Sequence, residues 1–276
     1  MSQEQQPSDT AARQVVRLAD YRPPTFRTLD VALVFELDPE TTTVRATQRF
    51  ARDGERRGPL VLDGENLELV AIRLDGEALL ERAYTLDGTS LILHSPPDSF
   101  TLEIENRIHP AANTALEGLY VSSGIFCTQC EAEGFRRITW FQDRPDVMTR
   151  FRVRIEADKA RYPHLLSNGN PVGGGDLVGG RHYALWDDPF PKPAYLFALV
   201  AGDLALLEDH YTTASGRAVT LRIYSEHENI DQCHHAMASL KKSMAWDEAR
   251  YGLEYDLDLF MIVAVADFNM GAMENK

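Results

Sequence analysis

Short runs with apolar residues at every second position recur through the first two hundred residues and restrict this part of the chain to β structure. In residues 28–38, TLDVALVFELD, the apolar side chains are Leu29, Val31, Leu33, Phe35 and Leu37. This spacing is typical of a strand with one buried and one wet face. Residues 149–156 repeat the pattern, and further strands are predicted at 42–50, 59–64, 67–76, 84–94 and 100–106. We therefore expect a mainly β, mostly antiparallel fold.

Turn residues separate these runs. Asp-Gly pairs at 75–76 and 87–88 favour hairpins. The glycine-rich stretch 168–183 lacks the Lys-Ser/Thr of a phosphate loop and is instead typical of hairpin turns. The following DDPFPKP, residues 187–193, predicts an extended, rigid approach to an apolar strand at 194–202.

The pattern changes after about residue 203. Apolar residues then step by three and four positions, which predicts an amphipathic helix that Gly252 can end: Ile230, Cys233, Met237, Leu240 and Met244. The apolar run 257–266 predicts a buried strand. We expect a polar tail at 1–24, a β-rich domain at 25–203, and at 204–276 the beginning of a mixed α/β domain with too few elements to bury its own core.

Charge and cysteine content exclude several classes of partner. The formal net charge is −14, and such a surface repels phosphate backbones, so we expect no nucleic acid partner. No stretch reaches the roughly 18 apolar residues of a membrane span, so no membrane partner is expected. The start of the chain lacks a secretory signal, and three cysteines favour a reducing compartment, which indicates a cytoplasmic protein.

Two motifs could carry metal or redox chemistry. Cys127 and Cys130 form a CxxC, but a redox pair would need a βαβ setting and a structural zinc site would need a second ligand pair, so two thiols in a tight turn is the simpler interpretation. The nearest approach to His-Glu-x-x-His has aspartate in place of the second histidine. A zinc site from His227, Asp231 and Cys233 is therefore a weaker interpretation than capping acids and surface histidines. We expect no complete catalytic set in this chain.

The stretch NMGAMENK, residues 269–276, follows the predicted buried strand directly. Gly271 and Ala272 permit close backbone approach, so an extended peptide could pair there as an added strand. Glu274 could hold an ammonium group through charge-assisted hydrogen bonds. An ordinary acidic loop would explain the same residues.

GAMEN, residues 271–275, resembles the exopeptidase motif of the gluzincin zinc aminopeptidases. CTQCEAEGFR (127–136), DPFPKPAYLFALVAGDL (188–204) and the stretch 240–276 resemble the same family, so the resemblance runs from about residue 20 to the last residue. It implies an amino-terminal β-saddle domain, then a thermolysin-like catalytic domain, with a border near Gly202-Asp203. It also implies a zinc enzyme that removes amino-terminal residues from peptides with a free amino terminus.

The resemblance also implies roles for individual residues. Glu274 would bind the α-amino group of the substrate, and Glu131 would reach the same group from the β-rich domain. Gln129 and Met270 would line the pocket for the first side chain. Gly271 and Ala272 would offer backbone contacts, and Met273 and Asn275 complete the substrate-binding set. Two anions at a closed pocket end suit an exopeptidase, because they attract the ammonium and fix its distance from the scissile bond.

The chain departs from the family pattern in one respect. The family's zinc ligands and general-base glutamate lie beyond GAMEN, whereas this sequence ends at Lys276. We therefore expect a fragment without the remainder of the catalytic domain, with no zinc bound to this chain and no activity of its own. The alternative is a non-catalytic β-rich module that binds peptides or scaffolds a partner.

Overall fold

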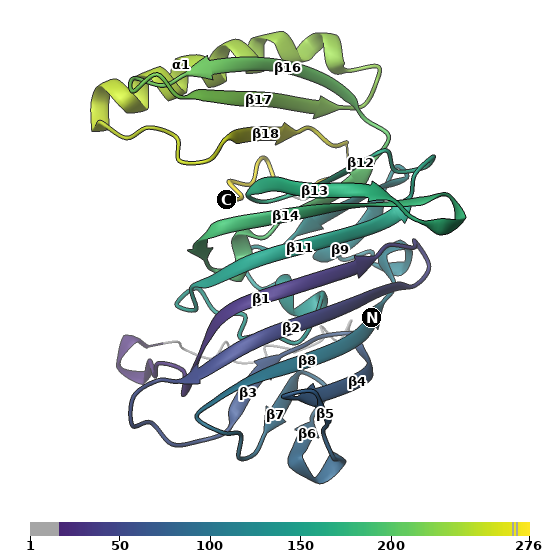
Figure 1. The fold of residues 1–276 in the computed structure, drawn as a ribbon, viewed down its shortest axis with the longest axis vertical. Coiled ribbons are helices and arrows are strands. Elements are labelled where there is room, and N and C mark those ends of the chain that lie inside the picture. Colours follow the sequence, from purple (N-terminus) through teal and green to yellow (C-terminus); the bar gives the residue numbers. More distant parts are fainter. Residues whose placement is uncertain (1–16, 267, 269) are drawn as a thin grey trace, which may run out of the picture.

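The structure, a computed structural model, describes residues 17–266, 268 and 270–276. An eight-stranded sheet of order β13-β14-β11-β1-β2-β8-β4-β5 spans most of the molecule (Figure 1). Its strands are β1 (Phe26–Glu36), β2 (Thr42–Arg52), β4 (Glu68–Leu74), β5 (Glu77–Ala78), β8 (Ser99–Ile108), β11 (Thr149–Asp158), β13 (Asn170–Asp176) and β14 (Arg181–Lys192).

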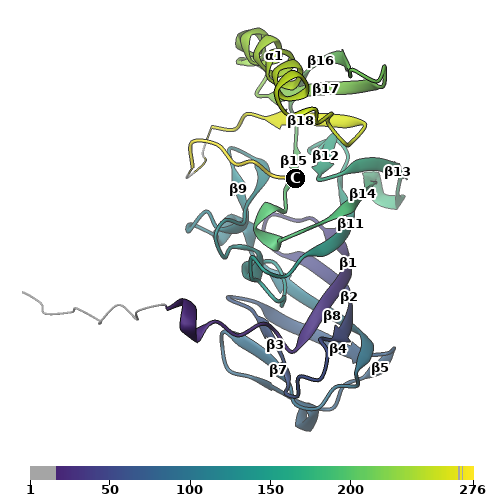
Figure 2. The same cartoon turned by 90° about the vertical axis from the view of Figure 1, so that its left-hand side faces the viewer.

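Two smaller sheets cover one face of the large sheet (Figure 2). One has the order β12-β15-β10-β9, with β9 (Gly118–Ser122), β10 (Ile125–Gln129), β12 (His164–Ser167) and β15 (Leu199–Gly202). The other has the order β3-β7-β6, with β3 (Leu60–Asp63), β6 (Tyr84–Leu86) and β7 (Ser90–Leu93). Val31, Leu33 and Phe35 of β1, Leu37 directly after it and the alternating apolar residues of β11 belong to one core cluster with the first of these sheets. Phe50 and Leu102 meet Leu62 in a second core cluster. The predicted alternation is wrong at Leu29, which is exposed because the pairing of β1 with β2 shifts register between Thr28 and Asp30.

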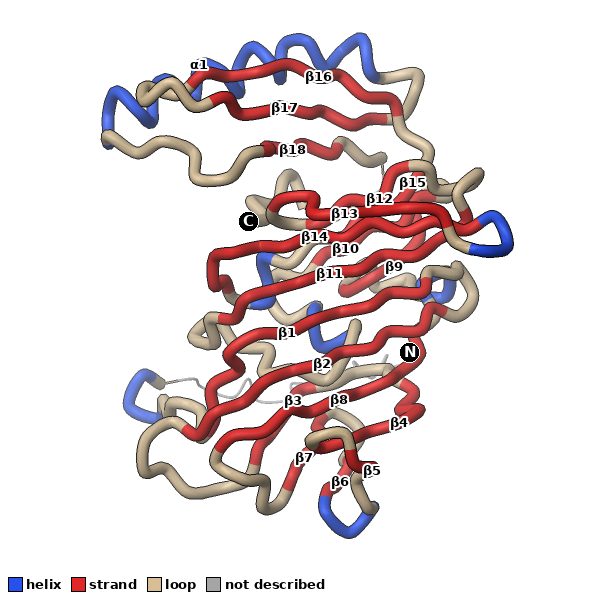
Figure 3. Tube along the Cα trace, viewed as in Figure 1, coloured by secondary structure: helices blue, strands red, loops and turns tan. Residues whose placement is uncertain are grey.

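A three-stranded sheet of order β16-β17-β18 lies at the end nearest β13, with α1 (His234–Tyr251) on one face (Figures 1 and 3). Its strands are β16 (Ala205–Thr212), β17 (Ala218–Ser225) and β18 (Leu259–Val263). Along β18, Phe260 and Ile262 pack with α1, whereas Leu259 belongs to the large core. Both faces of the strand therefore make apolar contacts. The buried strand predicted at 257–266 is nevertheless wrong in extent and burial, because the strand covers only Leu259–Val263 and, within it, only Leu259 is buried.

The predicted mainly β fold class is confirmed, as are the hairpin at the glycine-rich stretch and the helix end at Gly252, whose φ is +66°. The helix itself starts at His234, because Ile230–Cys233 form a 3-10 turn. The eight-stranded sheet also contains a parallel pair, β1 with β11. This pair joins strands that are far apart in the sequence.

The strand predicted at 194–202 is wrong in its first part. Ala194–Leu196 form a 3-10 turn, η6, and β15 begins only at Leu199. Ala194 and Phe197 are both buried, and a spacing of three brings both side chains to the same side of a tight turn.

The domain borders remain predictions, and most of the polar tail, residues 1–16, lies outside the described residues. The packing across the second border is continuous, since Leu204, Tyr224 and Leu259 share a core cluster with Phe35. Within the described part of the chain, no helix has both the length and the apolar character needed to cross a membrane.

Candidate substrate-anchoring site

Glu131 lies in a tight loop directly after β10. The amide of Gly134 donates to the carbonyl oxygen of Cys130 at 2.8 Å and closes the loop. A Cβ on Gly134 would stand 2.4 Å from the carbonyl oxygen of Gln129, so only glycine fits there. The peptide between Glu131 and Ala132 is cis. The Glu131 side chain is exposed at the surface of this loop.

Gln129 lies beneath the same loop and is almost fully buried. Its Nε2 donates to the backbone carbonyl oxygen of Glu131 at 3.4 Å. Its Oε1 is buried without a hydrogen-bond partner among the described residues. A buried acceptor without a partner costs stability until a donor group reaches it.

Cys127 and Cys130 are free thiols. Cys127 is part of β10, and Cys130 begins the Glu131 loop. Burial raises the pKa of the Cys127 thiol to about 12 and also raises the pKa of Cys130 well above its ordinary value. Both groups are therefore protonated at neutral pH, which makes them poor nucleophiles.

The GAMEN residues lie on the surface near the junction of β14 and β15 (Figures 1 and 2). Met270, Gly271, Ala272 and Glu274 are exposed, and Met273 is half-buried. The Asn275 side-chain amide donates to the carbonyl oxygens of Leu196 at 3.2 Å and Phe197 at 3.3 Å. Positions 267 and 269, which precede this segment in the sequence, lie outside the described residues.

Lys276 holds the end of this segment in place. Its Nζ lies 2.8 Å from Oδ2 of Asp256 and 5.0 Å from the centroid of the Phe190 ring. Asn275 and Lys276 therefore both attach the segment to residues 190–197, in and after β14.

The strand that carries Gln129 is attached to the same part of the chain. The amide of Leu199 donates to Oγ1 of Thr128 at 2.8 Å, and Cys127 is paired with Val200. Residues 196–200 thus contact both β10 and Asn275. The two predicted anchoring regions, around Glu131 and around Glu274, converge on one short segment. In the described part of the chain, no hydrogen bond or ion pair joins the two carboxylates directly.

The weaker zinc interpretation finds no support. His227 Nε2 lies 3.1 Å from Oδ1 of Asp203, and the Cys233 thiol donates to the carbonyl oxygen of Asn229 at 3.7 Å. Among residues 17–266, 268 and 270–276, no group of three or more His, Cys, Asp and Glu residues is arranged to hold a metal ion.

One buried ion pair next to the Glu131 loop was not predicted from the sequence. The backbone amide and Nε of Arg136 each donate to Oδ2 of Asp143 at 3.1 Å. Desolvation raises the pKa of Asp143 to about 6, although the hydrogen bonds from Arg136 lower it. The carboxyl is therefore ionised at neutral pH. Nothing in the sequence pattern marks this pair, because Arg136 lies in a single 3-10 turn, Phe135–Arg137, and Asp143 in an irregular segment.

Comparison with known proteins identifies the family. Residues 30–196 match the model of the peptidase M1 N-terminal domain. The chain belongs to the M1 peptidase family. It is 56% identical to aminopeptidase N of Caulobacter vibrioides over 267 residues, which cover 97% of this chain and 31% of that protein. It is 55% identical to aminopeptidase N of Escherichia coli over 257 residues, 93% of this chain and 29% of that protein.

A solved M1-like relative has the same fold. Aminopeptidase A of Legionella pneumophila, crystallised in complex with aspartic acid, matches with a TM-score of 0.90 and 35% identity over 95% of this chain and 31% of that one. The resemblance to zinc aminopeptidases is therefore confirmed at the level of the family. The chain spans about a third of the length of these relatives.

Proposed function

We propose that this chain forms the amino-terminal part of a zinc-dependent aminopeptidase that removes amino-terminal residues from peptides. In this proposal the chain supplies the anchor for the substrate α-amine and part of the pocket for the first side chain. The observation that carries it is the convergence of Thr128 and Asn275 on residues 196–199. This convergence supports the proposal because the segments that bear Glu131 and Glu274 both contact this part of the chain.

The two carboxylates suit an ammonium ligand. Each close ion pair would contribute a gross ~4 kcal/mol near a protein surface, before desolvation and salt screening are subtracted. The net charge of −14 adds a long-range attraction for cationic groups. The Legionella relative was crystallised with aspartic acid, and a free amino acid carries the α-ammonium group that this site would hold.

The remaining residues of the site receive complementary roles. Gln129, with its buried acceptor, and Met270 would line the pocket for the first side chain. Gly271 has no atom within 4 Å of an added Cβ position, so its backbone is open to an extended peptide, as is that of the neighbouring Ala272. Met273 and Asn275 would complete the substrate-binding edge, and the contact of Asn275 with Leu196 would keep that edge in place.

The described residues do not fit a zinc ion, since they bring together no suitable set of ligands. We therefore assign the metal and the general base to the part of the enzyme beyond this chain, and we assign no reaction step to the residues described here. The three cysteines are free thiols, which supports a reducing compartment and a cytoplasmic enzyme.

The test is kinetic and uses the intact enzyme that carries this chain. Replacing Glu131 or Glu274 by Gln should lower kcat/KM for amino-acid amide substrates by about 100-fold, because each variant loses one charge of the amine anchor. Glu81→Gln changes an exposed carboxylate in the connection between β5 and β6, two strands at the end of the molecule away from α1. It is the control and should change kcat/KM by less than about twofold. Unchanged kinetics in both site variants would refute the proposal.

A separate result would favour the alternative function. If the gene encodes no segment beyond Lys276, and the product binds peptides with free amino termini without hydrolysing them, the chain is a binding module. If the reading frame continues into a His-Glu-x-x-His segment, the enzyme assignment holds.

A further inference from the structure

Arg136 binds Asp143 through three separate groups. Its backbone amide and its Nε share Oδ2 of Asp143, and its Nη2 donates to the Asp143 carbonyl oxygen at 3.1 Å. The side chains are 15% and 2% exposed. A guanidinium held at several points in a buried site has a fixed orientation, so this pair fixes the backbone at Arg136 as well as its charge.

Asp143 belongs to a rigid segment, residues 142–146. Its amide donates to Oδ2 of Asp63 at 3.2 Å. The Gln142 side chain accepts from Oγ1 of Thr28 at 2.7 Å and donates to the carbonyl oxygen of Phe26 at 3.1 Å. These contacts attach the segment to β1 and β3, the framework of the large sheets.

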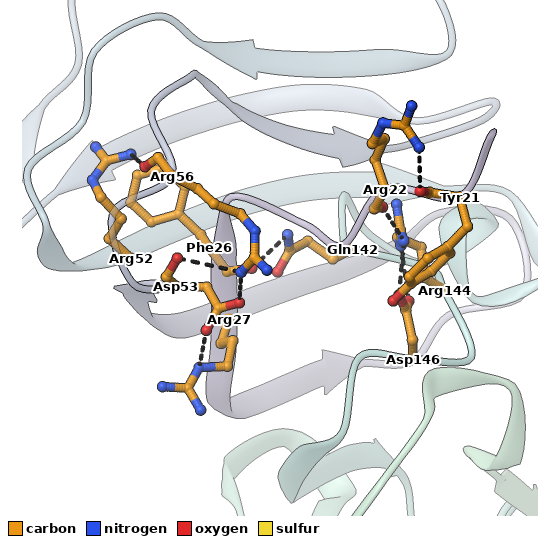
Figure 4. Close-up of polar contacts among 10 residues, drawn as sticks. All are labelled: Tyr21, Arg22, Phe26, Arg27, Arg52, Asp53, Arg56, Gln142, Arg144 and Asp146. Atoms are coloured by element: carbon orange, nitrogen blue, oxygen red, sulfur yellow. Dashed lines mark hydrogen bonds and ion pairs between the residues drawn. The ribbon is translucent and has the colours of Figure 1, made fainter. Parts of the chain in front are cut away.

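The other end of the segment is attached to the start of the described chain (Figure 4). Arg144 donates to the backbone carbonyl oxygen of Arg22 at 2.9 Å and to Oδ2 of Asp146 at 2.7 Å. The Tyr21 hydroxyl donates to the same carboxylate at 2.9 Å. Asp143 is therefore held from both sides, and Arg136 binds to a fixed point.

Only residues 132–135 separate Glu131 from Arg136. The loop between them is closed by the bond from Gly134 to Cys130, and the Arg136 side chain also lies 3.3 Å from the carboxylate of Glu133. Because only four residues separate the two and a hydrogen bond closes the loop, a shift of Arg136 would displace the backbone that carries Glu131.

We infer that Arg136 and Asp143 are positioning residues that hold the Glu131 carboxylate where it can bind the α-amine of the substrate. This inference rests on the proposed function of Glu131. Neither residue contacts the substrate in this account, and their effect acts through the loop alone.

The test is a double-mutant cycle in the intact enzyme. Asp143→Asn keeps the shape of the side chain but removes its charge, and should lower kcat/KM for amino-acid amide substrates by about 10- to 100-fold, mainly through KM. In the Glu131→Gln background the same change should have almost no further effect, because no anchor remains to be positioned. Asp30→Asn, which breaks an exposed pair with Arg49, is the matched control and should leave kcat/KM unchanged.

The outcomes separate the two claims. If Asp143→Asn reduces kcat/KM equally with and without Glu131, its role is general support of the fold, and the inference fails while the proposed function stands. If Glu131→Gln has no effect, the inference fails because Glu131 is then not an anchor, and the proposed function fails as well only if Glu274→Gln also has no effect. Arg136→Lys, which keeps the charge but loses the planar group, should reproduce the KM effect of Asp143→Asn. It serves as the second variant if thermal unfolding shows that Asp143→Asn does not fold, and an unchanged KM in Arg136→Lys would overturn the inference.

Discussion

The side-chain amide of Asn275 donates to the carbonyl oxygen of Leu196, 79 residues earlier in the chain, over 3.2 Å. The same amide reaches the carbonyl oxygen of Phe197 at 3.3 Å. Both carbonyls belong to the turn between β14 and β15, and β15 pairs with the strand that leads to Glu131. One side chain thus connects the GAMEN segment to the support of the other candidate anchor.

Replacing Asn275 by Ala should loosen residues 270–276. The variant loses two hydrogen bonds to backbone carbonyls, which together contribute about 1–3 kcal/mol to local stability. Hydrogen exchange of the backbone amides in this segment should become faster by tenfold or more, on the order expected from that free energy. Lys159→Met, which removes an exposed ion pair with Asp176 outside this segment, is the control and should leave exchange in residues 270–276 unchanged. Equal exchange rates in wild type and Asn275→Ala would contradict the anchoring role.

Lys192 and Asp188 should be strongly coupled in stability. Their side chains are 2% and 1% exposed, with Nζ 2.7 Å from Oδ2, and Nζ lies 4.3 Å from the centre of the Phe151 ring. Lys192→Met leaves a buried, unpaired carboxylate and should lower the free energy of unfolding by about 3–5 kcal/mol in urea titrations. The double variant Lys192→Met with Asp188→Asn should recover part of this loss. A double variant that is less stable than Lys192→Met would contradict the coupling.

Asp143 should make the protein more stable in mild acid. Its folded pKa of about 6 lies above the ordinary value of 3.8, mainly because burial disfavours the charged form. The protonated carboxyl of Asp143 therefore contributes about 3 kcal/mol to the free energy of unfolding below pH 4. This contribution is lost as the pH rises through 6. The free energy of unfolding of wild type relative to Asp143→Asn should fall by this amount between pH 4 and pH 7.

Asp146 provides a control of opposite sign. Its pKa is lowered, first by the hydrogen bond from Arg144. Its contribution is therefore present at neutral pH and is lost as the pH falls through the folded pKa, below the ordinary range. Asp146→Asn should lower the free energy of unfolding at pH 7, and should lower it by a smaller amount in acid. Equal signs for the two variants would show that pairing with Arg136, rather than desolvation, dominates at Asp143.

Gly134→Ala should distort the Glu131 loop. The new Cβ would lie 2.4 Å from the carbonyl oxygen of Gln129 and 2.9 Å from the amide nitrogen of Gly118, so the backbone itself must move. The expected cost is about 1–3 kcal/mol in the free energy of unfolding. Gly271→Ala, where the added Cβ meets nothing within 4 Å, is the matched control. Equal free energies of unfolding of the two variants would show that the loop backbone can shift to accept the Cβ without loss of stability.

The sequence predicts those parts of the fold in which one strand carries its own signal. The alternation in β1 and the apolar run of β18 both reflect which faces are buried. The parallel pairing of Val31 with Phe151 has no such signal, because it depends on two segments more than a hundred residues apart. The turn at Ala194–Leu196 was missed because its apolar residues also fit a strand.

The candidate site divides in the same way. Glu131 and Glu274 belong to motifs that can be recognised from the order of residues. The contacts that hold these two residues in place cannot be recognised in this way. Asn275 binds backbone carbonyls, which every residue has, and Arg136 binds an aspartate in irregular structure. Such contacts depend on the path of the chain in space, which no local pattern records.

A crystal structure of the intact enzyme with a bound amino acid tests the amine anchor directly. The α-ammonium nitrogen should lie within about 2.7–3.2 Å of a carboxylate oxygen from both Glu131 and Glu274. Asn275 should keep its contact with Leu196. An amino acid bound with its ammonium group away from either carboxylate would show that the two residues do not form the anchor.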